Sequence, residues 1–147
     1  MRILIRGKVW KLVHTSRLSK DIDGECDAPW VKKKKIKIRK GLKGERLLDA
    51  YIHECSHAAL WDLGEGPVAS LANAIAHELW NNNVRPGYRK TKKNLDKLEH
   101  EIVSVIWLRG EVAMFDESVR REVAHAVARM LNKLGWSFGK SNGLLSS

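Results

Sequence analysis

The chain has 147 residues, of which 44% are hydrophobic and 30% are charged, and this size and composition predict one domain, residues 1–147, around one core. No signal peptide is recognisable, no apolar run reaches membrane-spanning length, and two cysteines are too few for a disulfide scaffold. These features exclude secreted disulfide-rich and membrane-spanning classes, and we expect a cytoplasmic protein. Lysine and arginine outnumber aspartate and glutamate by 27 to 17, and the formal net charge of +10 favours encounters with polyanions.

Residues 1–45 are expected to form a small β-sheet. Apolar and basic residues alternate over residues 2–12, and residues 35–39 repeat this period of two, as half-buried strands do. The segment between them, residues 19–30, is rich in turn-forming residues and is expected to be a loop. The predicted order is therefore strand, loop and edge strand, because lysines suit the exposed edge of a sheet.

Helices are predicted for most of the remaining chain. Apolar residues recur at helical spacing over residues 47–60 and 68–79, so residues 46–83 are expected to form an antiparallel helical hairpin. The same spacing predicts two further helices within residues 94–135, and residues 137–147 are expected to be a flexible tail. The predicted fold class is α+β.

The first predicted helix contains the sequence His53-Glu54-Cys55-Ser56-His57, which is an HExxH box. Residues four apart lie on the same face of a helix, so His53 and His57 can present imidazole nitrogens to one Zn²⁺ ion. Catalytic zinc sites use a third protein ligand and leave the remaining position for water. Glu54 is placed to take the proton of that water and pass it to the leaving amine. The box therefore predicts a zinc metallopeptidase, a hydrolase with Glu54 as the catalytic base.

The third metal ligand has two candidates. Glu65 stands at the start of the second predicted helix, where a tight hairpin brings it back near the HExxH helix. Glu78 follows His57 at nearly the spacing used by zincins with a distant glutamate ligand, and His77 lies beside it. The hairpin geometry favours Glu65. Candidates for stabilising the oxyanion, each of which also suits an ordinary polar surface position, are His77, Tyr88 and His100.

Several runs of residues resemble a family of small phage-encoded zinc metallopeptidase-like proteins, and the wider group of minimal zincins that includes SprT-like and ImmA/IrrE-like peptidases. The resemblance covers about residues 20–80. In the phage family a glutamate stands three residues before the valine of the second helix, and Glu65 before Val68 matches that position. Gly66 and Pro67 depart from the acidic or polar residues usual there. The matching runs are Gly24-Glu25-Cys26-Asp27, Ile36-Lys37-Ile38, Leu42-Lys43-Gly44-Glu45, LLDAYIHECSHAALWDLGE, Val68, Leu71-Ala72, Ile75-Ala76 and Leu79-Trp80.

The resemblance implies a zincin-like fold. In such a fold a small N-terminal sheet packs on the HExxH helix, and a second helix supplies the third ligand; three further helices follow the HExxH helix in this chain. It also implies a phage or prophage origin, and therefore the cytoplasm of a bacterial host. SprT-like relatives act on DNA-bound proteins and ImmA-like relatives act on repressors. Either substrate would suit a basic protein, by analogy at the level of the fold.

Basic residues gather in two tracts, over residues 32–46 and 85–93. A solvated surface is the simpler explanation, and a nucleic-acid footprint is the alternative. Trp30 and Tyr88 lie nearby in the sequence and would offer stacking surfaces for bases. The residues predicted to contact nucleic acid are Lys33, Lys34, Lys35, Lys37 and Arg39. The tryptophans expected to lie in the core are Trp61, Trp80 and Trp107.

Three functions follow from these features. The leading hypothesis is a zinc endopeptidase that hydrolyses a protein or peptide substrate, which could itself be bound to nucleic acid. The second is a nucleic-acid-binding protein on a zincin fold with a structural or vestigial metal. The third is an interaction protein, because six tryptophans in a small chain can line a partner surface. No feature of the sequence specifies an oligomeric state.

Overall fold

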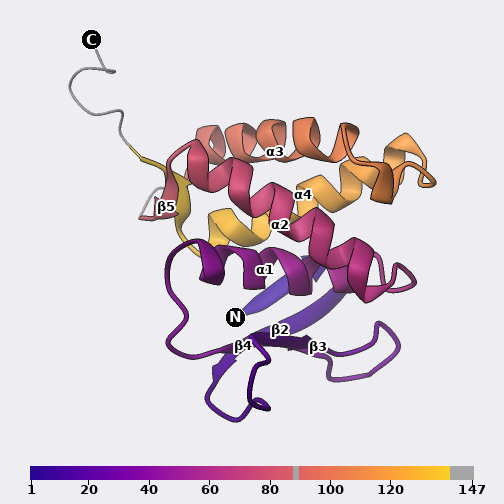
Figure 1. The fold of residues 1–147 in the computed structure, drawn as a ribbon, viewed down its shortest axis with the longest axis vertical. Coiled ribbons are helices and arrows are strands. Elements are labelled where there is room, and N and C mark those ends of the chain that lie inside the picture. Colours follow the sequence, from indigo (N-terminus) through magenta and orange to yellow (C-terminus); the bar gives the residue numbers. More distant parts are fainter. Residues whose placement is uncertain (88–89, 140–147) are drawn as a thin grey trace.

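The computed structural model describes residues 1–87 and 90–139. Figure 1 shows α1 lying between the N-terminal sheet, which has four strands, and the other helices. This arrangement confirms the predicted α+β fold class. None of the described helices is long and apolar enough to cross a membrane. The elements are β1 (Arg2–Ile5), β2 (Lys8–Thr15), β3 (Gly24–Cys26), β4 (Lys35–Arg39), α1 (Gly44–Ala59), α2 (Glu65–Asn81), β5 (Val84–Pro86), α3 (Lys92–Trp107), a 3₁₀ turn (Gly110–Val112), α4 (Glu117–Lys133) and β6 (Trp136–Phe138).

The N-terminal sheet has the strand order β1-β2-β4-β3. β1 and β2 form an antiparallel hairpin in which Ile5 pairs with Lys8. The two residues between them, Arg6 and Gly7, both have positive φ (47° and 79°), as a two-residue hairpin turn requires. The alternating apolar and basic residues over residues 2–12 therefore belong to two strands joined by a turn, and the prediction of a single strand is wrong.

Residues 35–39 form β4, which lies inside the sheet and not at its edge as predicted. β2 pairs with β4 in parallel, and β3 pairs with it on the other side in antiparallel orientation. Ile36 and Ile38 are completely buried, which suits an internal strand. The edge position belongs to β3, which lies within the predicted loop, because a strand of three residues is too short to show a periodicity.

The helical hairpin predicted over residues 46–83 is present as α1 and α2. Side-chain contacts at its two ends establish the antiparallel orientation: Glu65 meets His57 beside the turn, and His77 meets Glu45 at the open end. The start of α2 therefore lies beside the second half of α1, where the HExxH box is.

The two predicted C-terminal helices are present as α3 and α4. α3 begins where the Thr91 side chain accepts a hydrogen bond from the backbone N–H of Asn94. α4 begins in the same way, with Asp116 accepting from Val119. Such caps satisfy backbone N–H groups that the first turn of a helix leaves without partners, and each helix therefore begins before its first apolar residue.

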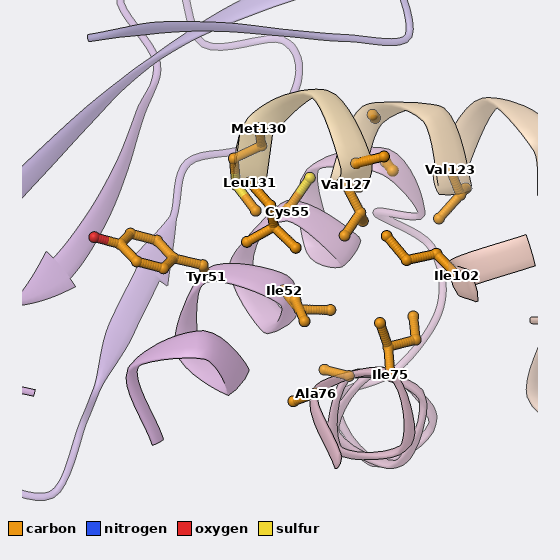
Figure 2. Close-up of a cluster of buried hydrophobic side chains, with 14 of the residues drawn as sticks. Tyr51, Ile52, Cys55, Ile75, Ala76, Ile102, Val123, Val127, Met130 and Leu131 are labelled. Atoms are coloured by element: carbon orange, nitrogen blue, oxygen red, sulfur yellow. The ribbon is translucent and has the colours of Figure 1, made fainter. Parts of the chain in front are cut away.

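Buried side chains of all four helices meet in one cluster (Figure 2). Ile52 and Cys55 of α1 gather there with Ile75 of α2 and Val127 of α4, and all four are completely buried. Truncating a core side chain of this size costs about 2–5 kcal/mol. This packing fixes the rotation of α1 about its axis, and its histidines are thereby held on another face.

The prediction of a flexible tail from residue 137 onwards is wrong for its first residues. Residues 136–138 form β6, which pairs with β5 in a second, two-stranded sheet. Trp136 and Phe138 are buried, so this segment is part of the core. Residues 140–147 of the predicted tail lie outside the described residues, as do Tyr88 and Arg89.

The predicted core positions of three tryptophans are wrong in part. Trp61 and Trp80 are only partly buried, and Trp107 is exposed. Trp107 ends α3, where the guanidinium groups of Arg120 and Arg121 cover its ring in place of apolar side chains. Other tryptophans, Trp10 and Trp136, fill the core instead.

Candidate metal centre

The two histidines of the HExxH box lie one turn apart on the face of α1 that turns away from the helical core. The Nε2 atoms of His53 and His57 are 3.1 Å apart, and both side chains are mostly buried. Burial lowers the pKa of His57, and the neighbouring His53 lowers it further, against an opposing effect of Glu65. Neutral imidazole, the form that binds a metal ion, is therefore favoured at His57.

Glu65, the first residue of α2, closes the group. Its Oε1 lies 2.8 Å from Nε2 of His53, and its Oε2 lies 2.7 Å from Nε2 of His57. The turn that carries it is held by the buried side chain of Leu63 and by a hydrogen bond from the Leu63 N–H to the carbonyl of Leu60. The ligand atoms of the three residues lie within 4.8 Å of one another, and no other such group occurs in the described part of the chain.

The rival ligands lie elsewhere. Nδ1 of His77 lies 3.1 Å from Oε1 of Glu45, in the first turn of α1. Glu45 precedes His53 by eight residues, which is about 12 Å along the axis of an α-helix. Glu78 accepts a hydrogen bond from the Asn82 amide at 3.0 Å. Because α2 runs antiparallel to α1, its second half lies beside the wrong end of the HExxH helix.

The oxyanion candidates are not brought to the box either. His77 is bound to Glu45, and His100 lies on α3. Neither lines the cleft beside the HExxH box. Tyr88 lies outside the described residues.

Glu54 is more deeply buried than the two histidines of the box, with 5% of its surface exposed. Its Oε1 lies 4.0 Å from Nε2 of His53. Burial raises the pKa of Glu54 to about 8, and the charges of Glu65 and Glu25 contribute. A carboxyl group with such a pKa exchanges protons near neutral pH, as an acid–base catalyst must.

Gly24 of β3 makes the close approach to Glu54 possible. A Cβ atom at this position would stand 2.7 Å from Cγ of Glu54 and 3.0 Å from the carbonyl oxygen of Lys37. Only glycine fits between the sheet and α1 here. Gly24 is not among the predicted site residues, because its importance depends on a contact between segments far apart in the sequence.

Asp49 precedes His53 by four residues and lies on the same face of α1. It is not among the predicted site residues, although this spacing is a signal in the sequence that could have identified it. Its Oδ1 is buried without a hydrogen-bond partner among the described residues. Burial raises the pKa of the Asp49 carboxyl, and the charge of His53 opposes this. Asp49 therefore offers an unused acceptor one helical turn from His53.

A cleft of about 750 Å³ opens over the box. One wall is formed by residues 21–27, which include β3; the floor is formed by α1, and the far end by Trp61 and the start of α2. Trp30 packs edge-on against Trp61, with ring centroids 5.7 Å apart, and is 73% exposed. Trp61, which was predicted to lie in the core, is therefore part of the wall of the cleft.

The residues predicted to contact nucleic acid do not form one uniform surface. Lys33 and Lys35 are exposed, whereas Nζ of Lys34 donates to the carbonyl of Val31 and lies over the ring of Trp10. Lys37 lies on the outer face of the sheet, where its Nζ is 3.9 Å from Glu25 Oε2.

Arg39, which was predicted to contact nucleic acid, forms hydrogen bonds within the protein. Its guanidinium donates to the backbone carbonyls of Ser19 and Ile22. Arg46 likewise holds the Asp23 carboxylate through two hydrogen bonds of 2.8 Å. Both arginines therefore stabilise the segment that forms the wall of the cleft.

The face of the sheet opposite α1 carries a row of basic residues. The strand registers pair Arg2 with Lys11 and Lys11 with Lys35, and all three residues are exposed. Like charges directly opposite one another on a sheet are destabilising. Arg2 and Lys11 were not among the predicted contact residues, because only the register between distant strands brings them beside Lys35.

Comparisons with models of protein families, with curated proteins and with solved structures find no match for this chain. The resemblance to phage-encoded metallopeptidase-like proteins therefore stays a prediction, and a function has to be argued from the site itself.

Proposed function

We propose that this protein is a zinc-dependent metallopeptidase on a zincin-like fold. His53, His57 and Glu65 hold Zn²⁺, and Glu54 is the general base in the hydrolysis of a peptide bond. The observation that carries the proposal is the convergence of the three ligand atoms within 4.8 Å, beside a carboxyl group that is 5% exposed.

The donor set fits zinc. Two imidazoles and one carboxylate are a common protein ligand set of catalytic zinc sites, and three ligands leave one position open. Donor atoms around one tetrahedral zinc ion stand about 3.3 Å apart. Here the separations are 2.8, 2.7 and 3.1 Å, so a shift of a few tenths of an ångström in each side chain suffices. The buried Oδ1 of Asp49 adds an acceptor near His53, as the second coordination shell of zinc-bound histidines usually provides.

The roles of the protein groups follow from their positions. Bound zinc supplies Lewis acidity, which activates water and polarises a carbonyl group. Glu54 takes the proton of the attacking water and returns it to the leaving amine. Its carboxyl group ionises more readily beside a bound cation, and the ionised form is the base. Gly24 keeps the backbone of β3 close to this carboxyl group.

We expect the peptide substrate to bind along the edge of β3. This strand pairs only with β4 in the described part of the chain, so its outer edge can accept an extended peptide through backbone hydrogen bonds. Because β3 lines the cleft, such a peptide would pass over the HExxH box. A protein substrate would therefore have to present an extended, locally unfolded segment.

The proposal is tested by the zinc content of the purified protein and by the hydrolysis of an unfolded protein such as casein. We expect one zinc per chain and measurable hydrolysis. Glu54→Gln should keep the zinc and lose about 10²- to 10⁴-fold in rate, because it removes only the general base. Absence of bound zinc from protein refolded with excess Zn²⁺, or full activity of Glu54→Gln, would refute the proposal.

A second function is favoured by a separate observation. The row Arg2, Lys11 and Lys35 on the outer face of the sheet places three cations side by side at a cost in stability, and a polyanion would relieve that cost. We propose that this face binds nucleic acid without sequence preference. Binding of a duplex DNA should weaken linearly on a logarithmic salt scale, and salt-independent binding or none at low salt would exclude it.

A further inference from the structure

The cleft over the HExxH box is acidic, although the protein as a whole is basic. Besides Glu54 and Glu65, five carboxylate side chains belong to its lining residues, whereas no lysine or arginine of the described residues does. The five are Asp21, Asp23, Glu25, Asp27 and Asp49. We propose that the cleft selects substrate segments that carry lysine or arginine side chains. This inference rests on the proposed function, because it names the substrate class of that same site.

Only part of this negative charge is available to a ligand, because a bound Zn²⁺ ion would offset the charges of Glu54 and Glu65. Asp23 is neutralised by Arg46. Glu25 is the cross-strand partner of Lys37, so its side chain lies on the outer face of the sheet, with Oε2 3.9 Å from Nζ of Lys37. The Asp27 side chain accepts a hydrogen bond from the backbone N–H of Lys35, and neither Asp21 nor Asp27 makes an ion pair with the described residues. Asp21 and Asp27 therefore remain in the lining of the cleft as carboxylates that no lysine or arginine of the described residues neutralises.

The net charge of +10 does not cancel this local field. Charges separated by more than about 8 Å of physiological salt solution are largely screened. A basic side chain inside the cleft therefore responds to the carboxylates that line it, and the cationic groups on the outer face of the sheet contribute little. The excess positive charge mainly slows the distant approach of a cationic substrate.

Two further features point to a ligand in the cleft. Glu54, whose surface is only 5% exposed, lines the cleft, and its carboxyl group makes no hydrogen bond among the described residues. At the far end, Trp61 lines the cleft, and Trp30 beside it is 73% exposed. Aromatic faces attract lysine and arginine side chains, so this pair suits the same cationic ligand as the acidic wall.

The test compares two fluorescent peptides that differ only in charge. One carries arginines, and the other carries citrulline, a neutral isostere, at each of those positions. Binding is measured by fluorescence polarisation with zinc-loaded Glu54→Gln protein, which does not consume the peptide. We expect the arginine peptide to bind about tenfold more tightly at low salt, and this ratio should shrink as salt rises. Equal binding of the two peptides, or binding of neither at low salt, would overturn the inference.

Paired variants locate the effect. Asp21→Asn with Asp27→Asn should weaken binding of the arginine peptide about fivefold and leave the citrulline peptide unaffected. Asparagine tolerates the positive φ of residue 21 (72°), so the loop should keep its shape. The control, Asp96→Asn with Glu117→Gln, makes the same change in net charge on α3 and α4, away from the cleft. An equal loss in this control would show that overall charge, and not the cleft, governs binding.

Digestion by the wild-type protein separates this inference from the proposed function. If both peptides are cut equally well, the metallopeptidase proposal stands and the selectivity falls. If neither is cut and no zinc is bound, but the arginine peptide still binds selectively, the cleft is a basic-peptide site and the metallopeptidase proposal falls.

Discussion

The two faces of the N-terminal region differ in charge and in burial. On one side, β3 and α1 enclose a cleft lined with carboxylates and containing the His53, His57 and Glu65 group. On the opposite face of the sheet, Arg2, Lys11 and Lys35 lie side by side and are exposed to solvent. A single net charge of +10 describes neither surface. The strand period of two explains the separation, because it turns isoleucines of β4 towards α1 and its basic residues outwards.

This difference between the faces predicts that zinc binds only in the cleft. Replacing one of the two histidines of the box is the variant with the largest expected effect. His57→Ala should lower zinc affinity by more than about a hundredfold, since removing an outer partner of a zinc ligand already costs about 10- to 100-fold. The measurement is metal content by mass spectrometry after dialysis. His77→Ala is the matched control on α2 and should keep its zinc, because His77 is bound to Glu45 and not to the box. Loss of zinc in His77→Ala alone would reverse the ligand assignment.

Adding one carbon atom at Gly24 should disturb the cleft and leave the outer face intact. In Gly24→Ala the new Cβ would meet Glu54 at 2.7 Å and the backbone of Lys37 at 3.0 Å. We expect a decrease of about 1–3 kcal/mol in the free energy of unfolding, together with a fall in peptidase rate. Thermal unfolding and casein hydrolysis measure the two effects.

Gly66→Ala is the control for that change. A Cβ at Gly66 meets no atom within 4 Å, and the residue lies in the first turn of α2. Stability should stay the same or rise by up to about 1 kcal/mol. If Gly24→Ala proves equally harmless, the contact between β3 and Glu54 does not constrain the site.

On the outer face, Lys11→Gln with Lys35→Gln should weaken DNA binding and make the slope of log affinity against log salt shallower by about 0.9 for each phosphate that is no longer neutralised. Peptidase activity should not change, since neither residue lines the cleft. Lys92→Gln with Lys93→Gln removes the same charge from exposed positions at the start of α3. If this second pair weakens binding as much, the sheet face is not the binding site.

The smallest effect is expected at the rim of the cleft. Trp30→Ala should weaken binding of the arginine peptide about two- to fivefold, the contribution of an exposed cation–aromatic contact. Its 73% exposure means that stability should change by less than about 0.5 kcal/mol. Trp107→Ala, at the end of α3, removes another exposed tryptophan and should leave peptide binding unchanged. Equal decreases in the two variants would place the effect outside the cleft.

The sequence by itself determined the features that depend on local spacing. A period of 3.6 residues is enough to predict α1, α2, α3 and α4, and the HExxH spacing places two imidazoles on one face. Glu65 was predictable as well, because only a short turn separates it from His57 and the hairpin leaves few places for it. Short-range connections of this kind depend little on the rest of the fold.

Only the tertiary structure decided the features that join distant segments. The parallel pairing of β2 with β4 puts Lys11 beside Lys35, and it places β4 inside the sheet with β3 at its edge. The closeness of Gly24 to Glu54 and the acidic wall of the cleft both follow from that edge position. A three-residue strand carries no periodic signal, and a register between strands is selected by burial of the whole face. The sequence therefore predicted the candidate metal ligands, whereas the charge of the surfaces around them is a property of the folded sheet.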